Sequence, residues 1–310
     1  MNRISVRIHA LTLVAGTLFG VFSGRAAEPT RTFPSPEDAV AALRNAVTQG
    51  DTAAITGIFG PEGAYLINPD PVLAASELKR FSHALSQGYQ IVPTGPNRRE
   101  LDAGTNSWPF PVPIVETGGT WRFDAEAGRE EILNRRIGAD ELKVLESLRA
   151  FVAAQREYAL SDRDGNEVLE YARKFISSPG RKDGLYWPPD LDGTESPIGP
   201  LVAAAQQEGY TPKAAGSPDP QPFHGYYFKI LTRQGRHAPA GAYDYMINGH
   251  LIGGFAAVAW PAEYGQTGVM TFIVNQQGRV YQKDLGAKTA TIASRMKEYD
   301  PGAGWVVSPD

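Results

Sequence analysis

The spacing of apolar residues changes from helical to strand-like along the chain, and this change constrains the fold more than any other feature. From 140 to 160, apolar residues recur every three or four positions, at Leu142, Leu145, Leu148 and Val152, which is the spacing of one helix face. After Gly225 the chain instead carries short runs of aromatic and β-branched residues, which favour strands. Helices and strands segregated in this way predict the α+β class.

The second half of the chain, residues 139–310, is expected to form one subregion. Its long helix should pack on a four- to five-stranded antiparallel meander, with strands at 226–231, 242–247, 255–260, 269–274 and 280–282. The 269–274 run is apolar on both faces, so this strand should be central and buried. Shorter helices are predicted at 167–176, 200–208 and 289–299.

Residues 27–138 are predicted to hold helices and a small antiparallel sheet. Ser35 and Pro36 begin a helix, because serine caps a helix start and proline fits its first position. Gly50 ends this helix. Further helices are expected at 51–59 and 76–87, and strands at 89–92, 98–102, 111–115 and 120–124.

Residues 1–26 read as a secretory signal peptide. Two arginines precede an apolar stretch at 10–22 that is too short to span a bilayer comfortably. Gly24-Arg25-Ala26 allows cleavage after Ala26, ahead of cleavage after Ala27. The alternative is an uncleaved anchor. Cleavage predicts a periplasmic or secreted protein without a further membrane span, because no other apolar run approaches about 18 residues.

The absence of cysteine and the acidic charge exclude several chemistries. A chain with no cysteine cannot form a disulfide, a thiol nucleophile, an iron–sulfur centre or a Cys-based zinc site, and it cannot carry a lipoprotein anchor. Signal cleavage removes three arginines and no acid, which takes the formal net charge from −4 to −7. Such a charge argues against nucleic acid as a partner.

The motifs of common enzyme classes are missing from the sequence. It contains no G-x-S-x-G elbow, no phosphate-binding G-x-x-x-x-G-K-[ST] loop and no H-E-x-x-H helix. Two acidic pairs, Glu130-Glu131 and Asp140-Glu141, are predicted to lie at a helix start, where carboxylates complement the helix dipole. This interpretation is preferred to acid–base catalysis.

One polar loop has the spacing of a calcium site. Asp162, Asp164 and Asn166 alternate as the first three ligands of an EF-hand loop do. The EF-hand glycine is replaced, and Arg173 stands where the bidentate glutamate belongs, so Glu170 would complete the site. The alternative is a polar turn that caps a following helix. A structural calcium ion is the only cofactor that the sequence suggests.

A Gly/Pro-rich loop offers a candidate surface for a ligand. Tyr186 and Trp187 follow Asp183 in this loop, and exposed aromatic rings stack on sugars or pack on partner proteins. The alternative is that both rings fold inward and anchor the loop. Further polar residues would join the site if the loops folded over the sheet: His224, Tyr226, Asp244, His250 and Lys283.

Six sequence segments together resemble one family of exported bacterial proteins that is classified as a domain of unknown function. The segments are FPSPEDA from 33, WRFD from 121, RRIG from 135, DGLYWP from 183, GGFA from 253 and VYQKDLG from 280. The resemblance covers nearly the whole mature chain. It implies one conserved unit, and it implies no activity.

The order of the predicted elements resembles two known folds. Two helices followed by a small sheet that ends in Trp-x-Phe, over roughly 33–135, resemble nuclear-transport-factor-2-like domains. A long helix followed by an antiparallel meander resembles the globular part of pilins and pseudopilins. The pilin cleavage site and apolar pilin helix are absent, so this resemblance does not imply a fibre.

These observations favour an exported binding or interaction protein without catalysis. Its expected partner is a cell-envelope polymer or another envelope protein. The alternative is a cell-envelope hydrolase that uses His224 or His250 with Asp183 or Asp244. In an enzyme, one of these histidines should lie within hydrogen-bonding distance of a carboxylate in a cleft. In a binding protein, the aromatic residues should be exposed and the histidines apart.

Overall fold

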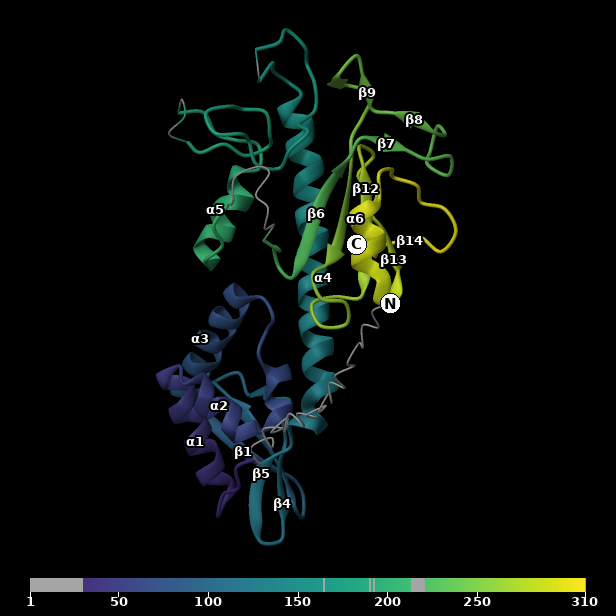
Figure 1. Cartoon of the computed structure of the whole chain (residues 1–310). Coiled ribbons are helices and arrows are strands. Elements are labelled where there is room, and N and C mark those ends of the chain that lie inside the picture. Colours follow the sequence, from purple (N-terminus) through teal and green to yellow (C-terminus); the bar gives the residue numbers. More distant parts are fainter. Residues whose placement is uncertain (1–29, 164, 190, 192, 213–220, 310) are drawn as a thin grey trace, which may run out of the picture.

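The protein consists of two lobes that are joined by one long helix (Figure 1). The computed structural model describes residues 30–163, 165–189, 191, 193–212 and 221–309. Lobe one comprises residues 30–124, and lobe two comprises residues 159–309. Helix α4 (Ala125–Tyr158) has 34 residues, a length of about 50 Å. The predicted signal peptide lies outside the described residues.

Lobe one is a small antiparallel sheet with helices packed against it. Its helical elements are α1 (Pro36–Gln49), α2 (Thr52–Phe59), the 3₁₀ helix η1 (Pro61–Leu66) and α3 (Pro71–Gln87). The strands are β1 (Tyr89–Gly95), β2 (Arg98–Ala103), β3 (Trp108–Pro109), β4 (Ile114–Thr117) and β5 (Thr120–Phe123). They pair in the order β1-β2-β4-β5, and β3 also pairs with β2.

Local capping signals set the helix ends of lobe one. The Ser35 hydroxyl accepts a hydrogen bond from the Asp38 amide at 3.0 Å, and Gly50 ends α1 at a φ of 65°, as predicted. Helix α3 begins five residues before its predicted start. The carboxylate of Asp70 caps it by accepting from the Val72 amide at 2.9 Å, and Pro71 takes the first helical position.

Helix α4 differs from its prediction because it begins at Ala125 rather than near 140. Two glycines interrupt the helical pattern of this stretch. A Cβ on Gly128 would lie 2.7 Å from the Pro111 carbonyl oxygen, so close packing requires this glycine. The predicted boundary at 138/139 therefore falls inside one helix. The acidic pairs Glu130-Glu131 and Asp140-Glu141 likewise lie in its interior rather than at a helix start.

Lobe two contains a five-stranded antiparallel meander, of which four strands were predicted and β14 (Val306–Val307) was not. Its main strands are β6 (Tyr226–Leu231), β11 (Ala256–Pro261), β12 (Met270–Asn275), β13 (Tyr281–Asp284) and β14 (Val306–Val307). Strand β12 is central in the order β14-β13-β12-β11-β6, and all but its first residue are buried. Helix α4 contacts β12, and α6 (Thr289–Arg295) contacts β11. Figure 1 shows the sheet between these two helices.

Short elements surround this sheet. They are α5 (Gly199–Glu208), β7 (Arg233–Gln234), β8 (Tyr243–Asp244), β9 (Met246–Ile247), β10 (His250–Leu251) and the 3₁₀ helix η2 (Gly286–Lys288). The predicted strand at 242–247 is thus two short strands outside the main sheet. β8 pairs with β7, and β9 pairs with β10.

The helix predicted at 167–176 is absent, because tertiary hydrogen bonds hold this segment in an irregular path. The side-chain amide of Gln155 on α4 bonds both the N–H and the carbonyl of Ala172 at 2.8 Å. The Tyr171 amide donates to the Leu251 carbonyl at 2.8 Å. These partners replace the bonds that a helix would make. The helix predicted from the spacing of apolar residues in this segment is therefore wrong.

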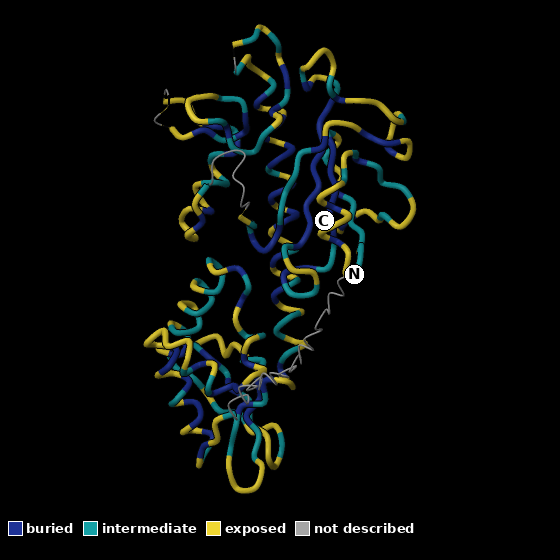
Figure 2. Tube along the Cα trace, in the orientation of Figure 1, coloured by how far each residue is buried: buried dark blue, intermediate teal, exposed yellow. Residues whose placement is uncertain are grey.

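Each lobe has its own hydrophobic core, visible as two separate buried regions in Figure 2. Helix α4 contributes Ala125 and the half-buried Ile132 to the core of lobe one. Its contribution to the core of lobe two begins at Val144. Residues 133–143 belong to neither core, and we call this segment the neck. No described helix is both long and apolar enough to span a membrane.

Candidate functional site

The neck is hydrogen-bonded to both lobes. The guanidinium of Arg136 donates from Nη2 to the Tyr65 carbonyl of lobe one at 2.9 Å. Five residues later, Glu141 Oε1 accepts from the Val269 and Met270 amides of lobe two, at 3.0 and 2.9 Å. The helix therefore carries one polar anchor for each lobe, five residues apart near its middle.

Two charged side chains of the neck are buried and incompletely paired. Arg136 is 6% exposed, and its Nε and Nη1 have no hydrogen-bond partner among the described residues. Asp140 is 3% exposed, and no described residue pairs with its Oδ2. Buried polar atoms of native proteins are almost always satisfied by protein, water or ligand. These atoms therefore mark the neck as a candidate functional site.

Burial shifts the pKa of both groups away from their charged forms. It raises the pKa of Asp140 from 3.8 to about 8, and the charge of Glu77 adds to this effect while Arg136 opposes it. Burial likewise lowers the pKa of Arg136, against the nearby carboxylates of Glu77, Asp140 and Glu263. Asp140 is therefore mostly protonated at neutral pH, as perturbed groups in functional sites often are.

A hydrogen bond beside the neck links the lobes directly. The Tyr210 hydroxyl of lobe two donates to Asp70 Oδ2 of lobe one at 2.7 Å. The same hydroxyl accepts from the His224 amide at 3.2 Å. Burial, followed by the hydrogen bond to Asp70, raises the pKa of Tyr210. The hydroxyl therefore stays protonated and keeps its role as the donor.

His224 and Gly225 form a tight turn against the neck. Both have positive φ angles, 47° and 69°, which is uncommon for a histidine. A Cβ on Gly225 would lie 3.0 Å from Asp140 Oδ2 and 2.7 Å from Thr267 Cβ, so only glycine fits. The His224 ring is nearly buried, with Nε2 3.0 Å from Glu208 Oε2. Burial lowers the pKa of His224, and Glu208 opposes this shift.

An open pocket of about 350 Å³ lies along the neck. Helix α4 supplies most of its lining, and the β11–β12 connection supplies the rest. The lining residues are Glu126, Arg129, Glu130, Leu133, Asn134, Ile137, Gly265 and Val269. A lining that combines apolar and charged side chains is compatible with a small-molecule site. Leu133 and Ile137 lie one helical turn from Arg136 and Asp140.

The predicted aromatic ligand loop folds inward instead of forming an exposed surface. Trp187 is 1% exposed, and its Nε1 donates to the Thr194 carbonyl at 3.1 Å. Tyr186 is half-buried and packs against the core of lobe two. Asp183 accepts from Lys174 Nζ at 2.6 Å and from the Ser178 amide at 2.7 Å. Burial opposes ionisation of Asp183, but these hydrogen bonds outweigh it and lower its pKa.

The remaining predicted residues make contacts in different places. Tyr226 is fully buried and donates to the Met270 carbonyl. Asp244 faces Arg233 at 3.7 Å, and Lys283 Nζ donates to the Ala303 carbonyl at 2.9 Å. The predicted pairing of a histidine with Asp183 or Asp244 is therefore wrong. His224 faces Glu208, and His250 faces Glu170.

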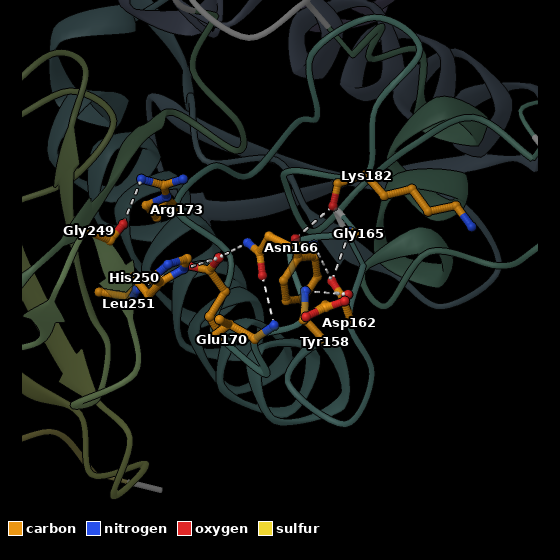
Figure 3. Close-up of polar contacts among 12 residues, drawn as sticks. Tyr158, Asp162, Gly165, Asn166, Glu170, Arg173, Lys182, Gly249, His250 and Leu251 are labelled. Carbon is orange, nitrogen blue, oxygen red and sulfur yellow. Dashed lines mark hydrogen bonds and ion pairs between the residues drawn. The ribbon is translucent and has the colours of Figure 1, made fainter.

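Figure 3 shows the loop that was predicted to bind calcium. Asp162 accepts from the amides of Gly165, Asn166 and Glu167, at 2.8, 3.2 and 2.9 Å. The loop is thus a turn closed by its own carboxylate. Asp164 lies outside the described residues. Among the residues that are described, no group of three His, Asp or Glu side chains is arranged to hold a metal ion.

Glu170 is used to orient His250 rather than to face Asp162. Its Oε1 lies 3.0 Å from His250 Nδ1 and accepts from Asn166 Nδ2 at 2.7 Å, while Oε2 accepts from the Leu251 amide. Burial would raise the pKa of Glu170, but these hydrogen bonds lower it. Figure 3 shows how the hydrogen bonds of Glu170 connect the 162–170 loop to the β9–β10 hairpin.

Sequence reasoning missed the residues of the neck. Asp140 and Glu141 were interpreted as helix-start acids, Arg136 appeared only within the RRIG family segment, and Asp70 and Tyr210, which adjoin the neck, carried no motif. One signal was available: Asp70 precedes a proline, which is the pattern of a capped helix start. Nothing in the sequence places Tyr210 beside Asp70, which is 140 residues away.

The architecture defines the protein as a two-lobed α+β protein with a polar site at the joining helix. By sequence, the chain belongs to the family described as "Protein of unknown function (DUF2950)", whose profile matches residues 30–307. This confirms the resemblance that the six segments indicated. No curated protein and no solved structure matches the chain. The likenesses to nuclear-transport-factor-2-like and pilin folds thus have no support beyond the order of the elements.

Proposed function

We propose that the protein is an exported, non-catalytic binding protein whose ligand lies in the pocket along the neck, where α4 meets lobe two. The observation that carries the proposal is that two lining residues of this pocket, Leu133 and Ile137, lie one helical turn from the buried, unsatisfied groups of Arg136 and Asp140. Ligand sites occur preferentially where domains meet. Export, which rests on the sequence of residues 1–26, makes a soluble fragment of the cell envelope the expected ligand.

The lining supports a small amphipathic ligand rather than a polymer. Leu133, Ile137 and Val269 supply apolar surface, and Glu126, Arg129 and Glu130 supply charge. A volume of about 350 Å³ is near the lower end for small-molecule pockets. Peptides and amino sugars released from the envelope combine apolar and charged groups at this scale.

A thermal-shift screen of the mature protein against soluble peptidoglycan fragments tests the proposal. A ligand should raise the melting temperature of the wild type, since binding only the folded state stabilises it. Ile137→Glu places a charge in the pocket and should abolish this shift. Ile292→Glu is the matched control, because Ile292 is 43% exposed on α6. Equal ligand shifts in both variants would place the ligand elsewhere.

The Glu170–His250 pair favours a second candidate, a cell-envelope hydrolase. A buried carboxylate on Nδ1 orients a histidine as a general base, and the His250 side chain is 30% exposed. Incubation with purified peptidoglycan tests this function. The wild type should release soluble fragments, and His250→Gln should not. A wild type that releases none would remove this candidate and leave the binding proposal unaffected.

A further inference from the structure

The neck has the features of a hinge between the lobes. Among the described residues, the chain passes between the lobes once, through α4. The two hydrophobic cores share no residue, and α4 contributes to neither core between Ile132 and Val144. Small interfaces between domains permit relative motion. The relative position of the lobes therefore depends on the neck and on the contacts beside it.

Gly138 lies at the centre of the neck, between the two polar anchors. Arg136 bonds lobe one and Glu141 bonds lobe two. A Cβ on Gly138 would meet no atom within 4 Å, so packing does not require glycine. In a helix interior, glycine is less stable than alanine. Glycine is also a common site of helix bending.

The pocket is lined from both sides of this glycine. Its α4 residues all precede Gly138, whereas Gly265 and Val269 belong to lobe two. A bend at Gly138 would move these two sets of lining residues relative to each other. The width of the pocket is therefore coupled to the angle between the lobes.

The contacts beside the neck hold one particular angle. The Tyr210–Asp70 hydrogen bond joins the lobes without involving α4. Next to it, the position of a Cβ on Gly209 lies 3.5 Å from Val72 Cγ1, so α5 and α3 touch at this point. These two contacts involve few atoms, and neither belongs to a hydrophobic core. Breaking them therefore leaves the core of each lobe intact.

We propose that the two lobes pivot about Gly138 and that the Tyr210–Asp70 hydrogen bond holds the observed arrangement, so that breaking this bond changes the width of the neck pocket. The pivot preserves both anchors, because Arg136 moves with lobe one and Glu141 moves with lobe two. Hinges of this kind control access to sites between domains. The inference concerns motion alone and does not depend on which ligand the pocket binds.

The chain contains no cysteine, so spin labels attach only to cysteines that are introduced to measure the distance between the lobes. Arg44→Cys on α1 and Lys288→Cys in lobe two replace exposed residues, and spin labels on this pair report the distance between the lobes. Tyr210→Phe should add a population at a changed distance, and Gly138→Ala in the same background should reduce it. Gly57→Ala is the matched control, because Gly57 is also helical and has no atom within 4 Å of its Cβ position.

Two results would overturn the hinge. One is a distance distribution in Tyr210→Phe that superimposes on that of the wild type. The other is a result in which Gly57→Ala reduces the population at the changed distance as much as Gly138→Ala does. Circular dichroism melting of each variant shows whether it is folded. If Tyr210→Phe does not fold, the comparison of Gly138→Ala with Gly57→Ala in the wild-type background decides the question, since neither added methyl group meets another atom.

Discussion

Replacing Asp140 with asparagine should stabilise the protein, and the gain should grow with pH. In the folded protein, burial and the charge of Glu77 raise the pKa of Asp140 from 3.8 to about 8. Below about pH 4 the carboxyl is protonated in both the folded and the unfolded chain, so ionisation costs nothing. Between about pH 4 and pH 8 the unfolded chain releases this proton and the folded chain retains it. Folding is therefore progressively disfavoured as the pH rises through this window.

The magnitude follows from the width of the window. Each pH unit costs the folded state about 1.4 kcal/mol, which gives about 4 kcal/mol at pH 7. Side-chain relaxation and water entry reduce such penalties in real proteins, so we expect a gain of about 2 kcal/mol. Asparagine is uncharged and nearly isosteric, so it should avoid the penalty without creating a cavity.

Urea denaturation at pH 5, 7 and 9 measures this effect. The difference in unfolding free energy between Asp140→Asn and wild type should be smallest at pH 5 and largest at pH 9. The matched control is Asp244→Asn, because Asp244 is exposed on β8 and its variant should differ from wild type by less than about 0.5 kcal/mol. A difference for Asp140→Asn that is the same at all three pH values would refute the reasoning.

Three further predictions concern the core, the polar loop and the N-terminus. Leu148→Ala should cost roughly 2–5 kcal/mol because Leu148 is fully buried, whereas Leu142→Ala on the same helix should cost far less because Leu142 is 64% exposed; chemical denaturation compares the two. Calcium should bind no more tightly than about 10⁻⁴ M, since Asp162 already accepts three backbone N–H bonds; calorimetry that detects tight binding would contradict this. Protein recovered from the periplasm or medium should begin at Ala27 or Glu28, and N-terminal sequencing that finds Met1 would contradict cleavage.

The elements with strong local signals were predicted closely from sequence. Ser35, Pro36 and Gly50 set the ends of α1, because caps act within one helical turn. The strand at 226–231 was predicted at its observed bounds. The central position of β12 also followed from sequence, since a strand that is apolar on both faces must be covered on both. These features depend on neighbours along the chain or on alternation alone.

The errors arose where distant contacts decide the conformation. The 167–176 segment has helical spacing, but Gln155 and Leu251 hydrogen-bond its backbone and hold it in an irregular path. Leu142 fits the apolar face of α4 in sequence, yet it points to solvent because the meander covers a different part of the helix. The sequence around Trp187 was compatible with either an exposed or a buried ring. The ring is buried because it packs against the core of lobe two.

The α+β class, the antiparallel meander, the absence of thiol chemistry and the family could all be derived from the amino-acid sequence. Each of these follows from composition, periodicity or ordered motifs, which survive without knowledge of spatial neighbours. Only the tertiary structure decided that Asp70 meets Tyr210 and that Asp140 lies against Gly225. These pairs come from segments far apart in the chain, and the pKa of Asp140 depends on the burial that they create. The physical basis of the candidate site is therefore long-range packing, which no local pattern encodes.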